Sequence, residues 1–256
     1  MNQTLERLQD IEKNGYQIDF GNVFNHAFEN YKKIALYAGS VIVIFSILFI
    51  VFTAFSLVSI IGIAEMTELS SEEDKIEKFM QSNILEMGFI SVFISCLLSP
   101  FQAAFLKMAD HGERDENFPV SSLFSFYKLP YFKEILVSTF LISSVSLAQT
   151  TLFRYIQFEI LGMLINLFIS FTTLLAVPLI IFGNLKAIDA IKHSIQIVLK
   201  QPFVLLALMI IAIIGSFIGI MACCFGIFFT MPFLYSMNYA IYSDIVGIDA
   251  PHKNEY

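Results

Sequence analysis

Six long runs of the sequence carry no charged side chain except near their ends. They fall at about residues 34–63, 84–109, 134–153, 158–183, 202–222 and 225–247. A helix rises about 1.5 Å per residue, so about 20 apolar residues cross the roughly 30 Å of hydrocarbon in a bilayer. Only 14% of the residues are charged, against about a quarter in an ordinary soluble domain. The sequence therefore predicts an all-α, polytopic membrane protein with six transmembrane helices.

The six runs are expected to form a single membrane domain over residues 19–249. A cytoplasmic N-terminal segment, 1–18, would precede it, and a cytoplasmic tail, 250–256, would follow. The N-terminus lacks a basic region followed by a short apolar core, so we expect no cleaved signal peptide. The first run would be roughly 45 Å long as a helix, which exceeds the hydrocarbon thickness and predicts tilt or a protruding end.

Lysine and arginine are divided unequally between the two sides that six crossings create. Of the 15 in the chain, Lys75, Lys78 and Arg154 fall on one side, and the other twelve fall on the side of the termini. This positive-inside bias predicts a bacterial inner-membrane protein with both termini in the cytoplasm. The acidic outer loop, TELSSEEDKIEKF, has a capping-box spacing at Ser70 and Glu73, which predicts a short helix.

Several classes of function find no support in the sequence. The net charge is −7 and no basic cluster occurs, which argues against a nucleic-acid partner. No phosphate-binding glycine motif is present, and the cysteines, Cys96, Cys223 and Cys224, form no CxxC pair. The four histidines, His26, His111, His193 and His252, show no ligand spacing such as HxxxH. We therefore assign no metal, cofactor or catalytic residue.

The segment LKAIDAIKHSIQIVLK is amphipathic at helical spacing. Asp189, Lys192, His193, Gln196 and Lys200 form a polar stripe. The opposite arc holds Ile188, Ile191, Ile195, Val198 and Leu199. This pattern is typical of a helix that lies in the membrane interface. We call such a segment an elbow, because it would rest on the inner leaflet and turn the chain into the next span.

Two more elbows are predicted. At residues 20–33, apolar side chains recur at helical spacing, and His26 precedes Lys33 by seven residues, as His193 precedes Lys200. The third, PVSSLFSFYKLPYFKE, has apolar residues at Val120, Leu123, Phe124 and Tyr127, with Lys133 at the junction and Pro130 interrupting its regularity.

Proline also recurs, at Pro100, Pro178 and Pro232 in the second, fourth and sixth runs. Each is followed ten to twelve residues later by an aspartate: Asp110, Asp189 and Asp244. The sequence therefore predicts a threefold repeat of elbow, span, turn and proline-bearing span. A proline within a span frees a backbone carbonyl and bends the helix.

The stretch from Ala190 to Gly247 contains AIKHSIQIVLK, an apolar span, a small-residue turn at CCFG, and PFLYSMNYAIYSDIVG. It resembles the closing half of a broad group of bacterial six-span membrane proteins. That group is related to the YciC-like proteins and to the membrane domain attached to some glycerophosphoryl diester phosphodiesterases. The resemblance implies a six-helix inner-membrane fold. Its motifs are structural, and the phosphodiesterase domain is not present, so no catalytic residue carries over.

Four amide side chains fall inside the predicted spans: Gln102, Gln149, Asn166 and Asn238. Amides are unfavourable in lipid unless paired, so they should face the bundle interior. There they either bond neighbouring helices or form the polar lining of a cavity. No carboxylate or lysine lies deep in a span, which counts against an ion-coupled pump.

Three hypotheses for the function follow. The first is a non-catalytic module that binds membrane lipid, a protein partner or a second copy of the chain. The second is a transporter or channel for a small or amphipathic solute, which requires the four amides to line one continuous cavity. The third is an intramembrane lipid-modifying enzyme, for which His193, Asp189 and Asp244 are the nearby side chains.

Overall fold

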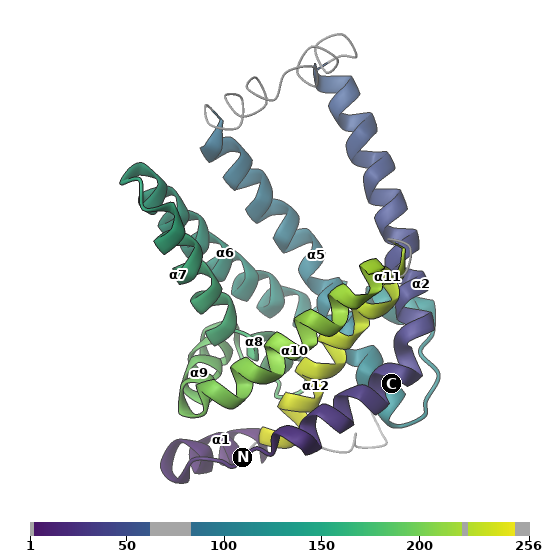
Figure 1. Cartoon of the computed structure of the whole chain (residues 1–256), viewed down its shortest axis with the longest axis vertical. Helices are drawn as coiled ribbons and strands as arrows, with labels where there is room; N and C mark the ends of the chain where they lie inside the picture. The colour runs from purple at the N-terminus through teal and green to yellow at the C-terminus, as the bar shows by residue number, and fades with distance from the viewer. Residues whose placement is uncertain (1–2, 62–82, 222–224, 249–256) are drawn as a thin grey trace.

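The chain is all-helical. The computed structural model describes residues 3–61, 83–221 and 225–248, and no strand occurs in these ranges (Figure 1). Five stretches are helical, long and apolar enough to cross a membrane. They are Phe20–Val51, Leu85–Glu113, Tyr131–Tyr155, Glu159–Ile181 and Pro202–Met221. The predicted all-α class is thereby confirmed, and these five helices are compatible with a multi-pass membrane protein.

Large apolar side chains cover the outside of these helices. Phe203 and Met221 on α10 (Pro202–Met221) are 85% and 89% exposed, and Ile160 on α7 (Glu159–Thr172) is 80% exposed. Soluble monomers rarely expose contiguous apolar patches above a few hundred Å². The outer surface is therefore suited to hydrocarbon and not to water.

The first predicted elbow and the first span form one helix, α2 (Phe20–Ile61). Its N-terminal part runs across the base of the molecule, and its later part rises away from it (Figure 1). We use "base" for the end that carries both marked termini. No proline interrupts residues 20–61, so the backbone hydrogen bonds continue through the change of direction.

The second and third spans are also continuous helices, α5 (Ile84–Glu113) and α6 (Tyr131–Tyr155). The fourth is interrupted at residues 173–175, between α7 and α8 (Ala176–Ile181). Across this break the Ser194 hydroxyl donates to the Thr172 carbonyl at 2.8 Å and accepts from the Leu175 N–H at 3.0 Å. A buried break is tolerated because a side chain from another helix satisfies its backbone groups.

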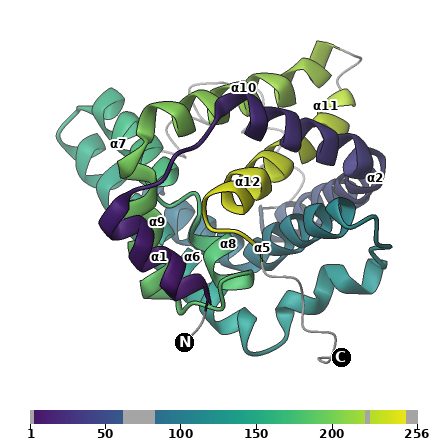
Figure 2. The same ribbon diagram turned by 90° about the horizontal axis from the view of Figure 1, so that it is seen from below.

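The last apolar run is divided at Met231 into α11 (Gly226–Thr230) and α12 (Pro232–Ile245). Pro232 takes the first position of α12, where its missing N–H has no intrahelical partner to lose. Seen from the base, α12 lies in the middle of the bundle, between α2, α5 and α10 (Figure 2). Most of its side chains are buried, including Met237 and Tyr242.

The predicted elbow after α8 is a separate helix, α9 (Ala187–Lys200). It has three faces instead of two. Ala190, Ser194 and Ile197 pack into the bundle, Ile188 and Leu199 are exposed and apolar, and the predicted polar stripe forms the third face. Such a helix can dock on the bundle and rest on lipid at once.

A helix at the N-terminus, α1 (Gln3–Asn14), packs against α9. Its Leu8 and Ile11 are buried, and the Tyr16 hydroxyl donates to the Ile197 carbonyl at 3.0 Å. Burial raises the pKa of Tyr16 above its ordinary value, so this phenol remains a donor. The predicted 1–18 segment therefore contains a helix that ties the start of the chain to α9.

The third predicted elbow forms a 3-10 helix, η1 (Val120–Tyr127). Its buried residues are Leu123 and Phe126, where the sequence pattern placed Leu123 and Phe124 on the apolar side. The difference follows from the 3-10 repeat of three residues per turn, which aligns positions three apart. Tyr127 donates to the Leu97 carbonyl at 2.6 Å, and burial raises the pKa of Tyr127 to about 12.

Some predictions concern residues outside the described ranges. These are the short helix at Ser70–Glu73, the turn at Cys223 and Cys224, and the tail that holds His252 and Lys253.

Candidate functional site

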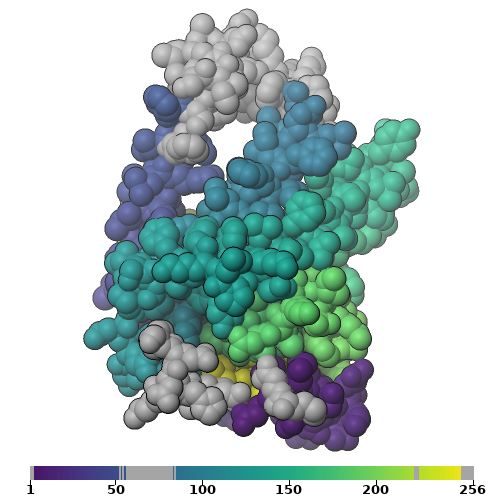
Figure 3. Space-filling model, turned by 180° about the vertical axis from the view of Figure 1, so that it is seen from behind, coloured from purple at the N-terminus to yellow at the C-terminus, as the bar shows by residue number. Residues whose placement is uncertain are grey.

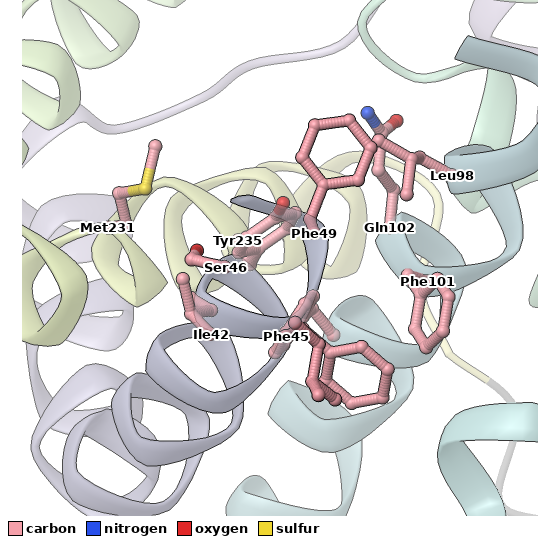
Figure 4. Close-up of a pocket in the computed structure, with 11 residues that line it drawn as sticks. Ile42, Phe45, Ser46, Phe49, Leu98, Phe101, Gln102, Met231 and Tyr235 are labelled. Carbon is pink, nitrogen blue, oxygen red and sulfur yellow. The ribbon is translucent and has the colours of Figure 1, made fainter. Parts of the chain in front are cut away.

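A pocket of about 500 Å³ lies between α2 and α5, and the residues around the break before α12 form its third wall (Figure 4). It is lined by Ile42, Phe45, Ser46, Leu48, Phe49, Leu98, Phe101, Gln102, Phe105, Met231 and Tyr235. The volume falls within the roughly 300–1,000 Å³ that is usual for small-molecule sites. None of these lining residues carries a charge.

Helical spacing gathers these side chains. Residues three and four apart lie on one face of a helix, and the lining residues of α5 are Leu98, Phe101, Gln102 and Phe105. The same spacing relates Ile42, Phe45, Ser46 and Phe49 on α2. Two adjacent helices that each present such a face leave an apolar space where their axes separate.

Aromatic rings form much of the pocket wall. The Phe45 and Phe101 rings, from facing helices, have centroids 4.7 Å apart and are tilted by 57°. Phe105 stacks on Tyr235, with centroids 4.9 Å apart and an interplanar angle of 25°. Contacts of this kind contribute about 0.5–1.5 kcal/mol each beyond the buried area. They hold α2, α5 and α12 together around the pocket.

Three lining residues are polar: Ser46, Gln102 and Tyr235. Within the described part of the chain, none of them makes a side-chain hydrogen bond to another residue. In hydrocarbon, an amide or hydroxyl without a partner is unfavourable. In Figure 4 Gln102 and Phe101 lie on the right of the view, Tyr235 lies to the left beside Ser46, and the Phe49 ring lies between the Gln102 amide and Tyr235.

The pocket opens toward the outside of the bundle. Leu48 is 59% exposed, and Phe49, Leu98 and Met231 are also exposed at its edge. Beyond it the far halves of α2 and α5 stand apart, as the view from behind shows (Figure 3). Because both helices are candidate membrane spans, the opening faces the region that lipid would occupy.

The four predicted amides lie in different surroundings. Gln102 lines the pocket, whereas Gln149 donates to the Gly162 carbonyl at 3.2 Å within the α6–α7 hairpin. Asn238 on α12 donates to the Leu174 carbonyl at 3.2 Å, at the break between α7 and α8. Asn166 is exposed on α7. The structure thus brings one of the four into the pocket and places the others elsewhere.

The three predicted prolines are all buried, but their backbones differ. Pro100 lies within the continuous helix α5, Pro178 follows the break between α7 and α8, and Pro232 begins α12. The aspartates that follow them also differ, because Asp110 is buried while Asp189 and Asp244 are exposed.

The predicted elbow residues lie mainly on the surface of the base. Lys133, Asp189 and Lys192 are exposed, and His193 is half-buried. Lys33 forms an ion pair with Asp115 at 2.8 Å, and Lys200 donates to the Glu12 carbonyl at 2.8 Å. His26 lies 3.0 Å from Glu113, between the Nε2 and Oε2 atoms.

A buried polar cluster below the pocket was missed by sequence reasoning. The Asn30 amide donates to the Ala109 carbonyl at 2.7 Å and accepts from the Ser236 hydroxyl at 2.9 Å. One step further along α5, the Asp110 carboxylate accepts from Lys107 at 2.7 Å and from Arg114 at 3.0 Å.

Tyr239 of α12 also donates to Asp110, at 3.3 Å. The cluster therefore joins three helices, with Asn30 on α2, Asp110 on α5, and Ser236 and Tyr239 on α12. The one buried carboxylate of the cluster is paired with two partly exposed cations, Lys107 and Arg114. We interpret the cluster as a structural contact that stabilises the packing of the three helices, because its polar groups are paired with one another.

No protein-family model, curated protein or solved structure matches the chain.

Proposed function

We propose that the chain is a non-catalytic protein of the bacterial inner membrane that binds lipid in the pocket between α2 and α5. The observation that carries this proposal is an uncharged, mostly apolar pocket of about 500 Å³, rich in aromatic rings, that opens sideways between two candidate spans. A ligand that enters such a pocket comes from the hydrocarbon phase and carries an apolar chain.

We further propose six crossings with both termini in the cytoplasm. α11 and α12 together cover residues 226–245, which at about 1.5 Å per residue would extend some 30 Å and supply the sixth crossing. The bias of lysine and arginine toward the side of the termini supports the orientation. The three buried prolines and the elbow α9 are compatible with the threefold repeat and with a relationship to the bacterial six-span proteins that are related to the YciC-like group.

The orientation predicts a specific labelling pattern. Cys96, Cys223 and Cys224 are first replaced by alanine, and single cysteines are introduced at Lys192 and at Arg154. A membrane-impermeant maleimide should label the Arg154→Cys variant in intact spheroplasts. The Lys192→Cys variant should be labelled only after permeabilisation, because the proposed topology places it in the cytoplasm. The reverse pattern would exclude this orientation.

The transport hypothesis receives less support from the geometry. It requires four amides along one cavity, and three of them lie outside the pocket: Gln149 and Asn238 bond other helices, and Asn166 is exposed. The enzyme hypothesis requires a histidine or carboxylate pair beside a pocket, and the pocket is lined by neither.

Lipid binding is tested by photo-crosslinking with the full chain in nanodiscs. The probe is a phosphatidylethanolamine that carries a diazirine near the end of one acyl chain, and the crosslinked peptides are mapped by mass spectrometry. We expect crosslinks at residues 42–49 and 98–105. The Ser46→Trp variant should reduce them several-fold, because the indole fills part of the pocket.

Ile47→Trp is the matched control, since Ile47 is the next residue on α2, is 55% exposed and does not line the pocket. Crosslinks to the outer face of α10 report ordinary surrounding lipid and should be equal in all variants. If Ser46→Trp left the crosslinks at 42–49 and 98–105 as strong as in Ile47→Trp, the pocket would not be a lipid site.

A further inference from the structure

The polar groups of the pocket on α5 and α12 lie farther from the base than the charged residues at the base end of the same helices. Gln102 precedes Asp110 by eight residues on α5, and Tyr235 precedes Asp244 by nine on α12. At about 1.5 Å per residue, these separations correspond to roughly 12–14 Å along each helix. A phospholipid phosphate lies at the level of charged residues, so in the proposed orientation the acyl chains of a phospholipid, and not its phosphate, would reach Gln102 and Tyr235.

The polar side chains of the pocket need hydrogen-bond partners in hydrocarbon. This need points to an uncharged ligand that carries its own polar atoms into the pocket. Gln102 and Tyr235 offer an amide N–H and a phenolic O–H, and Ser46 offers a hydroxyl. These donors suit carbonyl oxygens. The lining holds no charged side chain. Because an ion in hydrocarbon needs a counter-charge, the pocket is unsuited to a charged ligand.

The rings of the wall define the shape of the ligand. Phe45, Phe49, Phe101 and Phe105 come from two facing helices, and Tyr235 from a third. Rings associate with other planar π-systems in offset-stacked or edge-to-face geometry. A flat ring is also small enough for the pocket, and an attached apolar tail can leave through the exposed edge at Leu48 and Leu98.

We infer that the pocket binds an alkylated or prenylated benzoquinone: a planar ring with carbonyl acceptors on an apolar tail. This inference rests on the proposed function and names the class of lipid. The ring lies among the phenylalanines, its carbonyl oxygens accept hydrogen bonds from Gln102 and Tyr235, and the tail extends between α2 and α5. Binding requires no redox step.

The test is equilibrium binding of tritiated decylubiquinone to the full chain in nanodiscs, with tritiated decylbenzene as the ligand that lacks carbonyls. We expect saturable binding of decylubiquinone. Tyr235→Phe removes one hydroxyl and keeps the ring, so it should weaken decylubiquinone binding by about tenfold, the equivalent of one hydrogen bond. Binding of decylbenzene should be unchanged by the same substitution.

Gln102→Leu should have a similar effect on decylubiquinone, whereas Asn166→Leu, which removes an exposed amide on α7, should have none. Absence of saturable decylubiquinone binding, or equal binding by wild type and Tyr235→Phe, would overturn the inference. The phosphatidylethanolamine crosslinks then separate the two proposals. If Ser46→Trp still reduces them, lipid binding stands without the quinone; if it does not, both proposals fail.

Discussion

Replacing Asp110 by alanine is expected to destabilise the fold by about 3 kcal/mol. The carboxylate is almost fully buried and accepts hydrogen bonds from Lys107, Arg114 and Tyr239. Its removal leaves two cations and a buried hydroxyl without their common partner. Lys107 and Arg114 are partly exposed and can turn toward water, which places the expected loss at the low end of the roughly 3–5 kcal/mol seen when one member of a buried pair is removed.

The measurement is thermal unfolding of the detergent-solubilised chain, followed by loss of monodispersity. For a chain of this size, about 3 kcal/mol corresponds to a midpoint lowered by roughly 6–12 °C. Asp110→Asn keeps one acceptor oxygen for Arg114 and Tyr239, but it loses the charge and the oxygen that accepts from Lys107. Its midpoint should therefore lie between those of wild type and Asp110→Ala.

Asp189→Ala provides the matched control, because this aspartate occupies the equivalent place after Pro178 in the predicted repeat but is exposed. Its midpoint should stay within about 1–2 °C of wild type, as is usual for surface substitutions. Equal effects of Asp110→Ala and Asp189→Ala would show that the buried cluster contributes nothing particular to the fold.

The burial of Asp110 could not be predicted from its own helix. Lys107, Asp110 and Arg114 are spaced at three and four residues, and this spacing is also that of a solvated ion-pair face. The residue that distinguishes the two cases is Tyr239, which lies 129 positions away. Only the packing of α12 against α5 brings the two side chains together.

The five long apolar helices were predictable because hydrocarbon imposes one simple requirement, an uncharged length of about 20 residues. The interruptions were not, since they depend on partners elsewhere. Pro178 and Pro232 indicated bends, but the break before α8 lies at residues 173–175 and depends on the Ser194 hydroxyl of α9. Helix α1 left a signal in the spacing of Leu5, Leu8 and Ile11, but its twelve residues are otherwise polar.

Of the candidate site residues named from the sequence, only Gln102 lines the pocket. The sequence gives the helical face on which this amide lies, together with Phe101 and Phe105. It does not give the separation between α2 and α5, because that separation depends on how both helices pack against α12. The amides Gln149 and Asn238 looked equivalent to Gln102 in sequence and proved to be contacts between helices.

Replacing Gly226 by alanine is expected to destabilise the junction of α10 and α11 by about 3 kcal/mol, the upper end of the usual cost of overpacking. A Cβ at Gly226 would lie 2.2 Å from the Gly219 carbonyl oxygen and 3.0 Å from the Gly219 carbonyl carbon. These are backbone atoms of the facing helix, so relief requires the two helices to move apart. That movement would also weaken the hydrogen bond from the Thr230 hydroxyl to the Ser216 carbonyl.

Gly88→Ala separates this effect from the general consequence of adding a methyl group to a helical glycine. The nearest atom to a Cβ at Gly88 is also 2.2 Å away, but it is Cδ1 of Leu147, the end of a flexible side chain. Rotation of Leu147 can relieve that contact, and alanine is a better helix former than glycine by about 1 kcal/mol. In the same thermal assay, Gly88→Ala should therefore unfold close to wild type, and Gly226→Ala roughly 6–12 °C lower. Equal midpoints for the two variants would mean that α10 and α11 are not in backbone contact at Gly219 and Gly226.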